Sequence, residues 1–396
     1  MKLRLSQLPV RNQRVLMRVD FNVPLKDDGS ILDDSRIMGA LPSIRYVLEQ
    51  GGSLILMSHL GRPKGAIDPK ASLSPCAERL SALLQRPVIM APDCVGSAVD
   101  SLAQHLQNGS VLMLENLRFH VGEEEPAKEP GFVEGLARLG DVYVNDAFGT
   151  AHRAHASTAL IARFFPNKAA MGFLIEKELA NLEPLLKNPK RPFYAIIGGA
   201  KVASKAGIVK NLLSKLDALF IGGGMAFPFM AAQKISIGRS LCLETDIPIA
   251  KDIIEMAQQK GVQLHLPLDI VAKSDGASNT VFTSGLPAGW AGMDIGPKTV
   301  QAWKKEFHNA ATIYWNGPLG VYEQPPFDQG TLGIATALAK CTGIHTIVGG
   351  GDSIAAIQQM GLAPYFTHLS TGGGASLEFL EYGHLPGIDA LSDAVS

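Results

Sequence analysis

Arginine and histidine side chains follow four separate apolar segments in the first half of the chain. The segments are VLMRVDFNVP (15–24), LILMSHLGRP (54–63), VLMLENLRF (111–119) and VYVNDAFGTAHRAH (142–155). The candidate binding side chains at or beyond their ends are Asp20, Asn22, Arg36, His59, Arg62, Arg118 and Arg153. A guanidinium group binds phosphate through two parallel hydrogen bonds. Each arginine alone is more simply explained as a surface residue paired with an acid, but together they predict a site for one multiply charged small anion.

Two neighbouring features are interpreted differently. Arg18 lies inside an apolar segment, so we interpret it as part of a structural ion pair and leave it out of the site. His152 and His155 in HRAH have a spacing that fits zinc only if two further ligands are present, so a metal role is disfavoured.

In the second half, four apolar segments stop at glycines instead. They are AIIGGAKVASK (195–205), LFIGGGMAF (219–227), TIVGGGDSI (346–354) and HLSTGGGASLEF (368–379). Glycine permits positive φ and a close approach of the backbone to a ligand. Backbone N–H groups at the start of a helix bind phosphate groups. A single glycine run is weak evidence, but four of them predict a site for nucleotide phosphates.

Charged residues accompany these glycines. Lys201 and Lys205 are spaced i, i+4, which predicts one face of a first helical turn, where two ammonium groups repel unless an anion separates them. Asp352 fits a carboxylate that helps to hold Mg²⁺-nucleotide, or a plain helix N-cap with Ser353 as the competing cap. Glu323 is a candidate partner of ribose hydroxyls or a solvent-exposed residue.

The missing motifs narrow the functional class. The chain has no GxxxxGK[ST], which excludes a P-loop NTPase, and no GxGxxG, which disfavours a nicotinamide-dependent dehydrogenase. A two-lobed small-anion binding protein is the non-enzyme alternative. Such proteins are usually exported, and the first fourteen residues lack the apolar core of a signal peptide. Turnover of substrate with ATP distinguishes a kinase from that alternative.

Composition points to a cytosolic globular protein. The net charge is −1, which disfavours general binding to nucleic acid or membrane surfaces. The four cysteines are scattered, as in a reduced cytosolic protein, and no apolar segment approaches the length of a membrane span. We therefore expect a cytoplasmic protein that binds neither nucleic acid nor membranes.

Apolar strand-like segments alternate with helical patterns nearly throughout, which predicts an α/β fold with two doubly wound, mainly parallel-sheet (Rossmann-like) domains. We expect an N-terminal domain over 1–171, an inter-domain helix over 172–190 and a C-terminal domain over 191–379, with a tail of about 380–396 returning to the first domain. Pro184 is expected to kink the connecting helix, which is alternatively an ordinary surface helix of the second domain. Its predicted apolar stripe is Ile175, Leu179, Leu182 and Leu186.

The chain as a whole resembles the phosphoglycerate kinase family. The matching stretches, in family order and spacing, are RVDFNVPL, SHLGRP, LENLRF, NDAFGTAHRAHAST, GFLIEKEL, GGAKVASK, IGGGMAF, DIGPKT, WNGPLGVYE, GGGDS, STGGGASLEFLE and LPGI. One departure is Tyr382-Gly383-His384, where the family more usually has a Gly-Lys stretch, so the packing of the tail is left open.

The resemblance implies a glycolytic enzyme that reversibly transfers a phosphoryl group from 1,3-bisphosphoglycerate to ADP, giving 3-phosphoglycerate and ATP, with Mg²⁺. It implies direct in-line transfer, hinge-bending domain closure and a monomer. By similarity, the phosphoglycerate ligands are Asp20, Asn22, Arg36, His59, Arg62, Arg118 and Arg153, with Arg36 facing the transferring group. The catalytic set adds Lys201, Lys205, Gly350 and Gly373. The nucleotide ligands are Gly198, Lys205, Gly222, Gly223, Asn316, Pro318, Glu323, Gly349, Gly350, Gly351, Asp352 and Ser353, and Asp352 also holds Mg²⁺ through the nucleotide phosphates.

Overall fold

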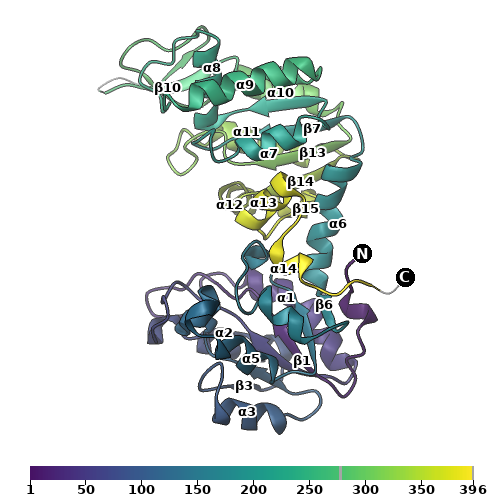
Figure 1. Cartoon of the computed structure of the whole chain (residues 1–396). Helices are drawn as coiled ribbons and strands as arrows, with labels where there is room; N and C mark the ends of the chain where they lie inside the picture. Colours follow the sequence, from purple (N-terminus) through teal and green to yellow (C-terminus); the bar gives the residue numbers. More distant parts are fainter. Residues whose placement is uncertain (276–278, 395–396) are drawn as a thin grey trace. The chain divides into compact units, whose positions relative to one another are not determined.

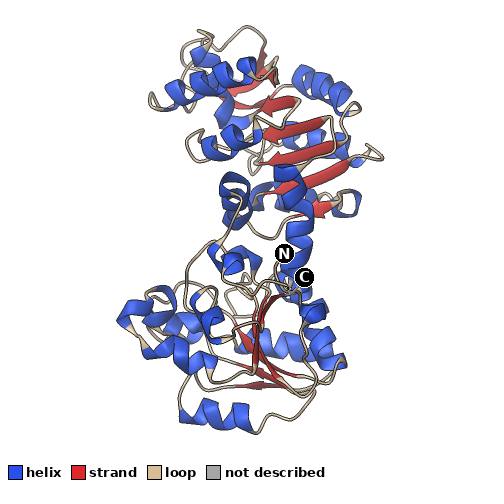
Figure 2. Ribbon diagram, turned by 45° about the vertical axis from the view of Figure 1, so that its right-hand side comes forward, coloured by secondary structure: helices blue, strands red, loops and turns tan. Residues whose placement is uncertain are grey.

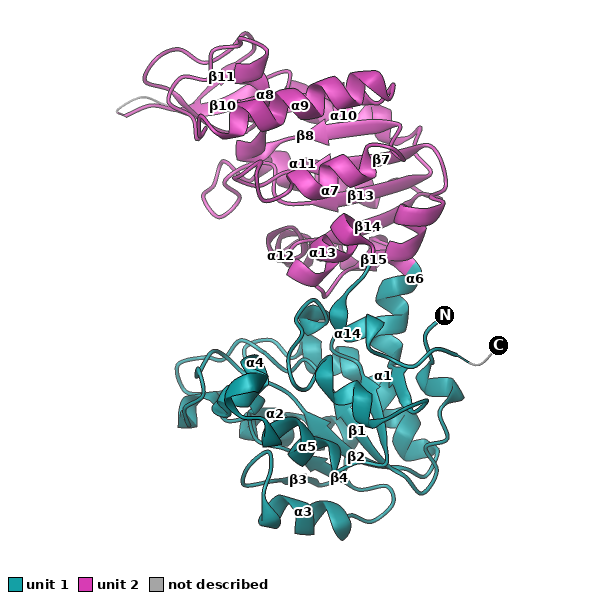
Figure 3. Ribbon diagram, viewed as in Figure 1, with its two compact units in different colours: residues 1–180, 384–396 teal, residues 181–383 magenta. Residues whose placement is uncertain are grey.

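The computed structural model describes residues 1–275 and 279–394, which divide into two compact units (Figure 3). Unit 1 comprises residues 1–180 and 384–396, and unit 2 comprises residues 181–383. Each unit contains a twisted sheet with helices packed against it (Figure 2). Within the described residues, no helix is both long enough and apolar enough to cross a membrane.

The sheet of unit 1 has six parallel strands in the order β3-β4-β2-β1-β5-β6. Its strands are β1 (Arg14–Arg18), β2 (Ser53–Met57), β3 (Val88–Met90), β4 (Val111–Met113), β5 (Val142–Asn145) and β6 (Ala169–Met171). Its longer helices are α1 (Ser35–Glu49), α2 (Ser74–Leu84), α3 (Ser97–Gln104) and α5 (Gly131–Ala137). Strands β1, β2, β4 and β5 coincide with the four predicted segments. β2 and β5 are wholly buried because helices cover both faces of a parallel sheet.

The main sheet of unit 2 is also parallel, in the order β15-β14-β13-β7-β8-β9. Its strands are β7 (Phe193–Ile197), β8 (Ala218–Ile221), β9 (Gln263–His265), β13 (Thr312–Asn316), β14 (His345–Gly349) and β15 (His368–Leu369). Its helices include α7 (Ala206–Leu212), α8 (Ala226–Ala232), α9 (Asp246–Gln259), α10 (Pro297–Phe307), α11 (Gln329–Ala339), α12 (Gly351–Gln359) and α13 (Gly374–Tyr382). The mainly parallel α/β fold predicted from the sequence is confirmed.

Unit 2 contains two features that the sequence analysis did not predict. β13 lies in the middle of the main sheet and pairs with both β7 and β14, although it was not among the predicted strand segments. A separate antiparallel sheet is formed by β10 (Ile270–Lys273), β11 (Thr280–Phe282) and β12 (Ala291–Ile295), in the order β11-β10-β12. Both features contribute residues to the site described below.

Helix α6 (Phe173–Lys187) connects the two units, and the division between them falls within it, at Ala180 and Asn181. Pro184 lies inside the helix. Asp146, just after β5, caps its start, because one carboxylate oxygen accepts hydrogen bonds from the amides of Leu174 (2.8 Å) and Ile175 (3.3 Å). The apolar stripe differs from the prediction at one position: Leu185 is buried, whereas Leu186 is only partly buried.

The C-terminal tail returns to unit 1, as predicted. After α13 ends at Gly383, which has a left-handed φ of 81°, the chain forms α14 (Pro386–Asp389). The amide of Leu3 donates to the Ser392 carbonyl (2.8 Å), so the first and last segments lie side by side (Figure 1). Gly387 packs against the backbone of Ala151, where a Cβ would lie only 3.0 Å from the Ala151 Cα. The Tyr382-Gly383-His384 departure therefore falls at a helix end, where glycine suits the turn.

Candidate active site

The predicted anion-binding residues of unit 1 lie around the carboxyl ends of its strands. Asp20 and Asn22 follow β1, His59 follows β2, and Arg153 follows β5. Arg118 lies in the short helix η3 (Leu117–Phe119) after β4, and Arg36 lies in the first turn of α1. The strand order reverses next to β1. Strands β2, β4 and β3 lie on one side of β1, and β5 and β6 lie on the other. Such a switch point is where open α/β sheets bind ligands.

Asp20 forms the centre of one group of contacts. Its carboxylate forms an ion pair with Arg36 and lies 3.9 Å from His59 Nδ1. The Asn22 side-chain oxygen accepts a hydrogen bond from the Gly61 amide (2.9 Å), which joins the chain after β1 to the chain after β2. These contacts bring Asp20, Arg36 and His59 together and link Asn22 to Gly61, which lies between the predicted residues His59 and Arg62. Arg62 is exposed and makes no ion pair among the described residues.

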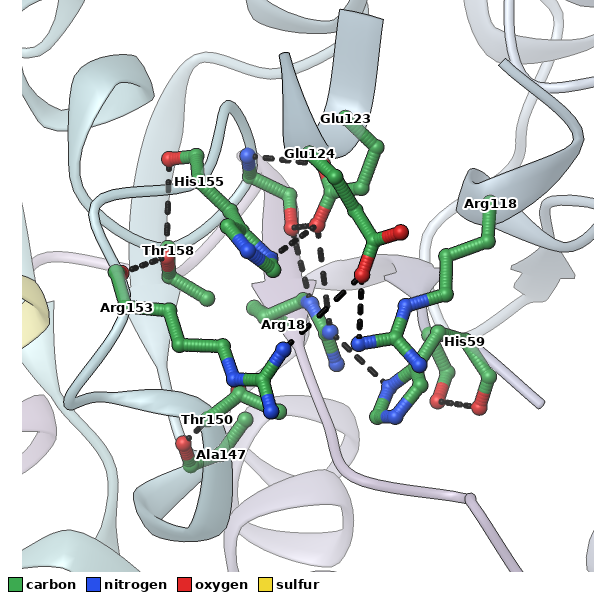
Figure 4. A network of polar contacts seen from close by, with 12 residues as sticks. Arg18, His59, Arg118, Glu123, Glu124, Ala147, Thr150, Arg153, His155 and Thr158 are labelled. Carbon is green, nitrogen blue, oxygen red and sulfur yellow. Dashed lines mark hydrogen bonds and ion pairs between the residues drawn. The ribbon is translucent and has the colours of Figure 1, made fainter. Parts of the chain in front are cut away.

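Arg118 and Arg153 share one carboxylate partner (Figure 4). Glu124 Oε1 lies 2.9 Å from Arg118 Nη2 and 3.9 Å from Arg153 Nη1. Arg118 also donates to the Gly61 carbonyl (2.7 Å). Two guanidinium groups that converge on one carboxylate can exchange it for a phosphate, which accepts more hydrogen bonds and carries more charge. Arg118 and Arg153 are therefore candidate phosphate ligands.

Arg18 forms the structural pair expected from the sequence, and it also contacts the site (Figure 4). Its buried guanidinium lies 4.0 Å from the buried Glu123 carboxylate and donates to Ser157 Oγ (2.8 Å). Arg18 Nη2 is 3.1 Å from His59 Nδ1. Because a guanidinium group only donates, Nδ1 must accept, and the neutral imidazole carries its proton on Nε2. Arg18 therefore leaves His59 with a single N–H donor, available to a substrate oxygen.

The sequence analysis missed Glu123 in this network and considered His155 only as a disfavoured metal ligand. Glu123 is fully buried, although it belongs to a run of three glutamates that is typical of solvated surface. His155 Nδ1 lies 3.9 Å from Glu123 Oε1. No local pattern marks these roles, because they depend on contacts with residues far along the chain.

The electrostatic field of this cluster is positive. Burial and the nearby charges of Arg18, Arg118 and Arg36 hold the pKa of His59 well below its usual range. Burial and neighbouring arginines, Arg153 first, lower the pKa of His155 to about 4. Both histidines are therefore neutral at physiological pH, because a further positive charge is unfavourable there. A bound polyanion relieves this repulsion.

Unit 2 contains the second candidate site, and Lys205 is its partly buried cation. Lys205 Nζ donates to the carbonyls of Gly198 (2.7 Å) and Asn316 (3.2 Å). Burial lowers its pKa to about 8, while the nearby Asp352 carboxylate raises it. The predicted helical pairing of Lys201 with Lys205 is wrong. Helix α7 begins only at Ala206 and Lys205 is its N-cap, so Lys201 lies in the preceding turn and is exposed.

Asp352 is not a plain helix cap. Gly350, with a φ of 88°, is the N-cap residue of α12, and Asp352 lies in the first turn of that helix, further in than the cap residue. Ser353 does not cap the helix either, since its hydroxyl accepts from the Gly317 amide (2.9 Å) and so holds the loop after β13. Because Asp352 does not cap the helix, its carboxylate is available to a metal ion bound to phosphates.

A cavity of about 640 Å³ opens beside Lys205. The predicted residues that line it are Lys205, Gly223, Asn316, Pro318, Glu323, Gly350 and Asp352. Its apolar wall includes Phe227, Ile270, Met293 and Leu319, of which Ile270 and Met293 come from the unpredicted antiparallel sheet. The lining thus combines charged residues and glycines with apolar side chains, which fits a ligand that joins phosphates to an aromatic base.

Other predicted residues do not line this cavity. They are Gly198, Lys201, Gly222, Gly349, Gly351, Ser353 and Gly373. Gly198 is required for packing, since a Cβ there would collide with the Pro318 carbonyl oxygen. Gly198 therefore allows its own backbone to pack closely against the loop after β13. Gly373 is the N-cap of α13, with a φ of 53°, and stays a predicted phosphate contact.

These two α/β units, one with clustered arginines and the other with a glycine-lined cavity, hold two candidate sites for ligands that carry phosphate groups. A family model described as phosphoglycerate kinase matches residues 5–383. The chain is 52% identical over 395 residues to phosphoglycerate kinase of Chlorobium limicola, covering 98% of this chain and 99% of the relative. It is 51% identical to that of Moorella thermoacetica, covering 99% of each chain.

Two solved structures extend the comparison. The phosphoglycerate kinase of Coxiella burnetii superposes with a TM-score of 0.88 at 40% identity, and that of Pyrococcus horikoshii with a TM-score of 0.84 at 33% identity. In both comparisons, 98% of each chain is covered. The chain therefore belongs to the phosphoglycerate kinase family.

Proposed function

We propose that the protein catalyses reversible phosphoryl transfer from 1,3-bisphosphoglycerate to ADP, giving 3-phosphoglycerate and ATP. The observation that carries this proposal is the pairing of Arg118 and Arg153 on one carboxylate, a phosphate-type site, in a chain of this family. An assay that couples ATP formation to added 1,3-bisphosphoglycerate tests it. Absence of ATP formation by the purified, folded chain would contradict the proposal.

In this proposal, each predicted site residue has a specific role in binding or in charge neutralisation. Arg62, Arg118 and Arg153 bind the phosphate that is not transferred, while Asp20, Asn22 and His59 orient the rest of the phosphoglycerate. Arg36 faces the transferring phosphoryl group. On the nucleotide side, the backbone around Gly350 and Gly373 binds phosphates, Lys201 and Lys205 neutralise charge, and Glu323 bonds the ribose. No side-chain nucleophile is needed, because phosphoryl transfer depends mainly on positioning and charge neutralisation.

Asp352 fits the proposed Mg²⁺ site. Mg²⁺ keeps several waters and is usually bound through one or two carboxylates together with substrate phosphates, and Asp352 supplies one carboxylate at the cavity. When bound, the ion neutralises the phosphate oxygens as charge develops on them. The residues of this chain hold and orient the phosphates around it.

We predict that Asp352→Ala raises the Mg²⁺ concentration needed for half-maximal activity and leaves binding of 3-phosphoglycerate nearly unchanged. The reason is that Asp352 lies at the nucleotide cavity of unit 2, whereas the phosphoglycerate ligands belong to unit 1. Titration of Mg²⁺ at fixed nucleotide measures the effect. Asp328→Ala removes a carboxylate at the start of α11 and serves as the matched control. An unchanged Mg²⁺ dependence in the Asp352 variant would remove it from the metal site.

A second prediction concerns Lys205. Lys205→Ala should lower kcat/KM by about 10²-fold, the loss typical when one charge-stabilising donor is removed from an active site. Since burial places the pKa of Lys205 at about 8, kcat/KM of the parent enzyme should fall as the pH rises through 8 and the ammonium loses its charge. Lys205→Arg stays charged, so that loss should move to higher pH. Lys210→Ala, on the surface of α7, is the control, and an alkaline limb that is identical in Lys205→Arg contradicts the assignment.

The proposed mechanism also requires motion. In-line transfer needs reacting atoms about 3–3.5 Å apart in a site that excludes water. The predicted phosphoglycerate ligands all belong to unit 1, and the predicted nucleotide ligands all belong to unit 2. We therefore propose hinge-bending closure when both substrates bind, with partial closure for either alone. Solution scattering should show a smaller radius of gyration with 3-phosphoglycerate plus a nucleotide analogue, and an unchanged radius would refute closure.

We further propose that the enzyme works as a cytoplasmic monomer without nucleic-acid or membrane partners. Each set of predicted ligands lies within one copy of the chain, so no second copy is required to complete either set. Analytical ultracentrifugation over a range of protein concentrations tests the monomer.

A further inference from the structure

A cysteine, a histidine and an aspartate converge in unit 1 in a cluster that the phosphoryl-transfer mechanism does not use. Asp93 and Cys94 follow β3, and His120 follows η3. Their ligand atoms, a carboxylate oxygen, Cys94 Sγ and a His120 ring nitrogen, all lie within 4.8 Å of one another. We propose that Asp93, Cys94 and His120 form a binding site for a thiophilic divalent cation of the Zn²⁺ or Co²⁺ type.

The orientation of His120 supports this proposal. Its Nε2 points at Asp93 Oδ1 (2.7 Å), and its Nδ1 lies 2.9 Å from Glu129 Oε1. In metal sites, a ligating histidine usually donates its other ring N–H to a carboxylate, which fixes the tautomer and the ring orientation. Glu129 is in that position, and the Gly122 amide holds its second oxygen (2.9 Å). The ring of Phe132 stacks on His120 at 4.6 Å and limits its rotation.

The ligand set selects the class of metal. A thiolate, an imidazole and a carboxylate suit zinc and neighbouring transition metals, whereas Mg²⁺ and Ca²⁺ prefer oxygen ligands alone. Cys94 is fully buried and its Sγ lies 2.9 Å from the Glu115 carbonyl, while the Asp93 side chain is about half exposed. Three protein ligands and one exposed side leave a fourth, tetrahedral position for water.

In the free protein, the two carboxylates around His120 satisfy an imidazolium, and the Cys94 thiol donates to the Glu115 carbonyl. Binding of the cation would displace one proton from Cys94 Sγ and one from His120 Nε2. The His120 Nδ1–H group would keep its hydrogen bond to Glu129. Burial raises the pKa of the Cys94 thiol well above its usual value. The pKa of His120 is raised overall. Burial lowers it, but the hydrogen bonds to Asp93 and Glu129 together raise it by more.

The test is a Co²⁺ titration of the full chain in buffer without nucleotide or chelator. We expect a sulfur-to-cobalt charge-transfer band that saturates at one equivalent. Cys94→Ser should abolish the band. Cys341→Ser is the matched control, because Cys341 also lies beside a histidine, with its Sγ 3.9 Å from His308 Nδ1. The band should survive in this control.

Glu129→Gln provides an independent variant that leaves all three ligands in place. It should weaken Co²⁺ binding about 10–100-fold at unchanged stoichiometry, the usual loss for an outer-shell partner. Zn²⁺ should raise the melting temperature of the parent chain and not that of Cys94→Ser. The proposal is overturned if the parent shows no band, if the band persists in Cys94→Ser, or if it is lost in Cys341→Ser. Circular dichroism confirms that each variant is folded.

Discussion

We expect Arg36→Ala to reduce turnover by about 10³-fold or more, the scale of loss when an arginine that neutralises a transferring phosphoryl group is removed. Arg36 lies in the first turn of α1, and its guanidinium pairs with Asp20 and is about one-third exposed, so it is both positioned and accessible. Affinity for 3-phosphoglycerate should fall far less, because Arg118 and Arg153 hold the other phosphate. Steady-state kinetics and direct binding together separate the two effects.

Two further variants sharpen the Arg36 test. Arg36→Lys should restore little activity, because an ammonium group lacks the planar, bidentate geometry of guanidinium. Arg45→Ala removes an arginine from the same helix that donates to the Leu83 carbonyl, and should leave turnover near the parent value. If Arg36→Ala keeps more than about a tenth of the parent turnover, Arg36 does not neutralise the transferring group.

The second large effect is expected from Arg18→Met, which should reduce the free energy of unfolding by about 3–5 kcal/mol, the usual cost of removing one partner of a buried ion pair. Arg18 and Glu123 are both about 1% exposed, so the variant leaves a buried carboxylate without its cation. Burial already raises the pKa of Glu123, and Arg18 lowers it. Without Arg18, Glu123 should take up a proton more readily, so the loss of stability should be largest at neutral pH and smaller in mild acid.

Controls for Arg18 lie in the same strand. Arg14→Met breaks the partly exposed pair with Asp141, and a loss of about 1 kcal/mol or less is expected there. The double variant Arg18→Met/Glu123→Gln should recover part of the lost stability. All three tryptophans lie in unit 2, so far-ultraviolet circular dichroism must accompany fluorescence during denaturant unfolding. A loss for Arg18→Met no larger than that for Arg14→Met would show that the buried pair contributes little.

Much of the fold could be predicted because the local signals agree. Apolar segments of strand length that alternate with helical patterns predict parallel α/β units, and β1, β2, β4 and β5 form where predicted. β13 was missed although all five of its residues are buried. Its central position depends on pairing with β7 and β14, which lie distant in sequence, and strand order is set by such non-local contacts.

In the candidate sites too, some features follow from local sequence and others depend on contacts between residues distant in sequence. The side chains at the strand ends could be predicted, because the carboxyl ends of parallel strands meet at one edge of a sheet. The positions of Lys201 outside helix α7, of Ser353 against the loop after β13 and of Glu123 in the interior could not, because each depends on tertiary packing. Burial, the pKa and the hydrogen-bond partner of a side chain depend on what packs against it, and those neighbours are distant in sequence.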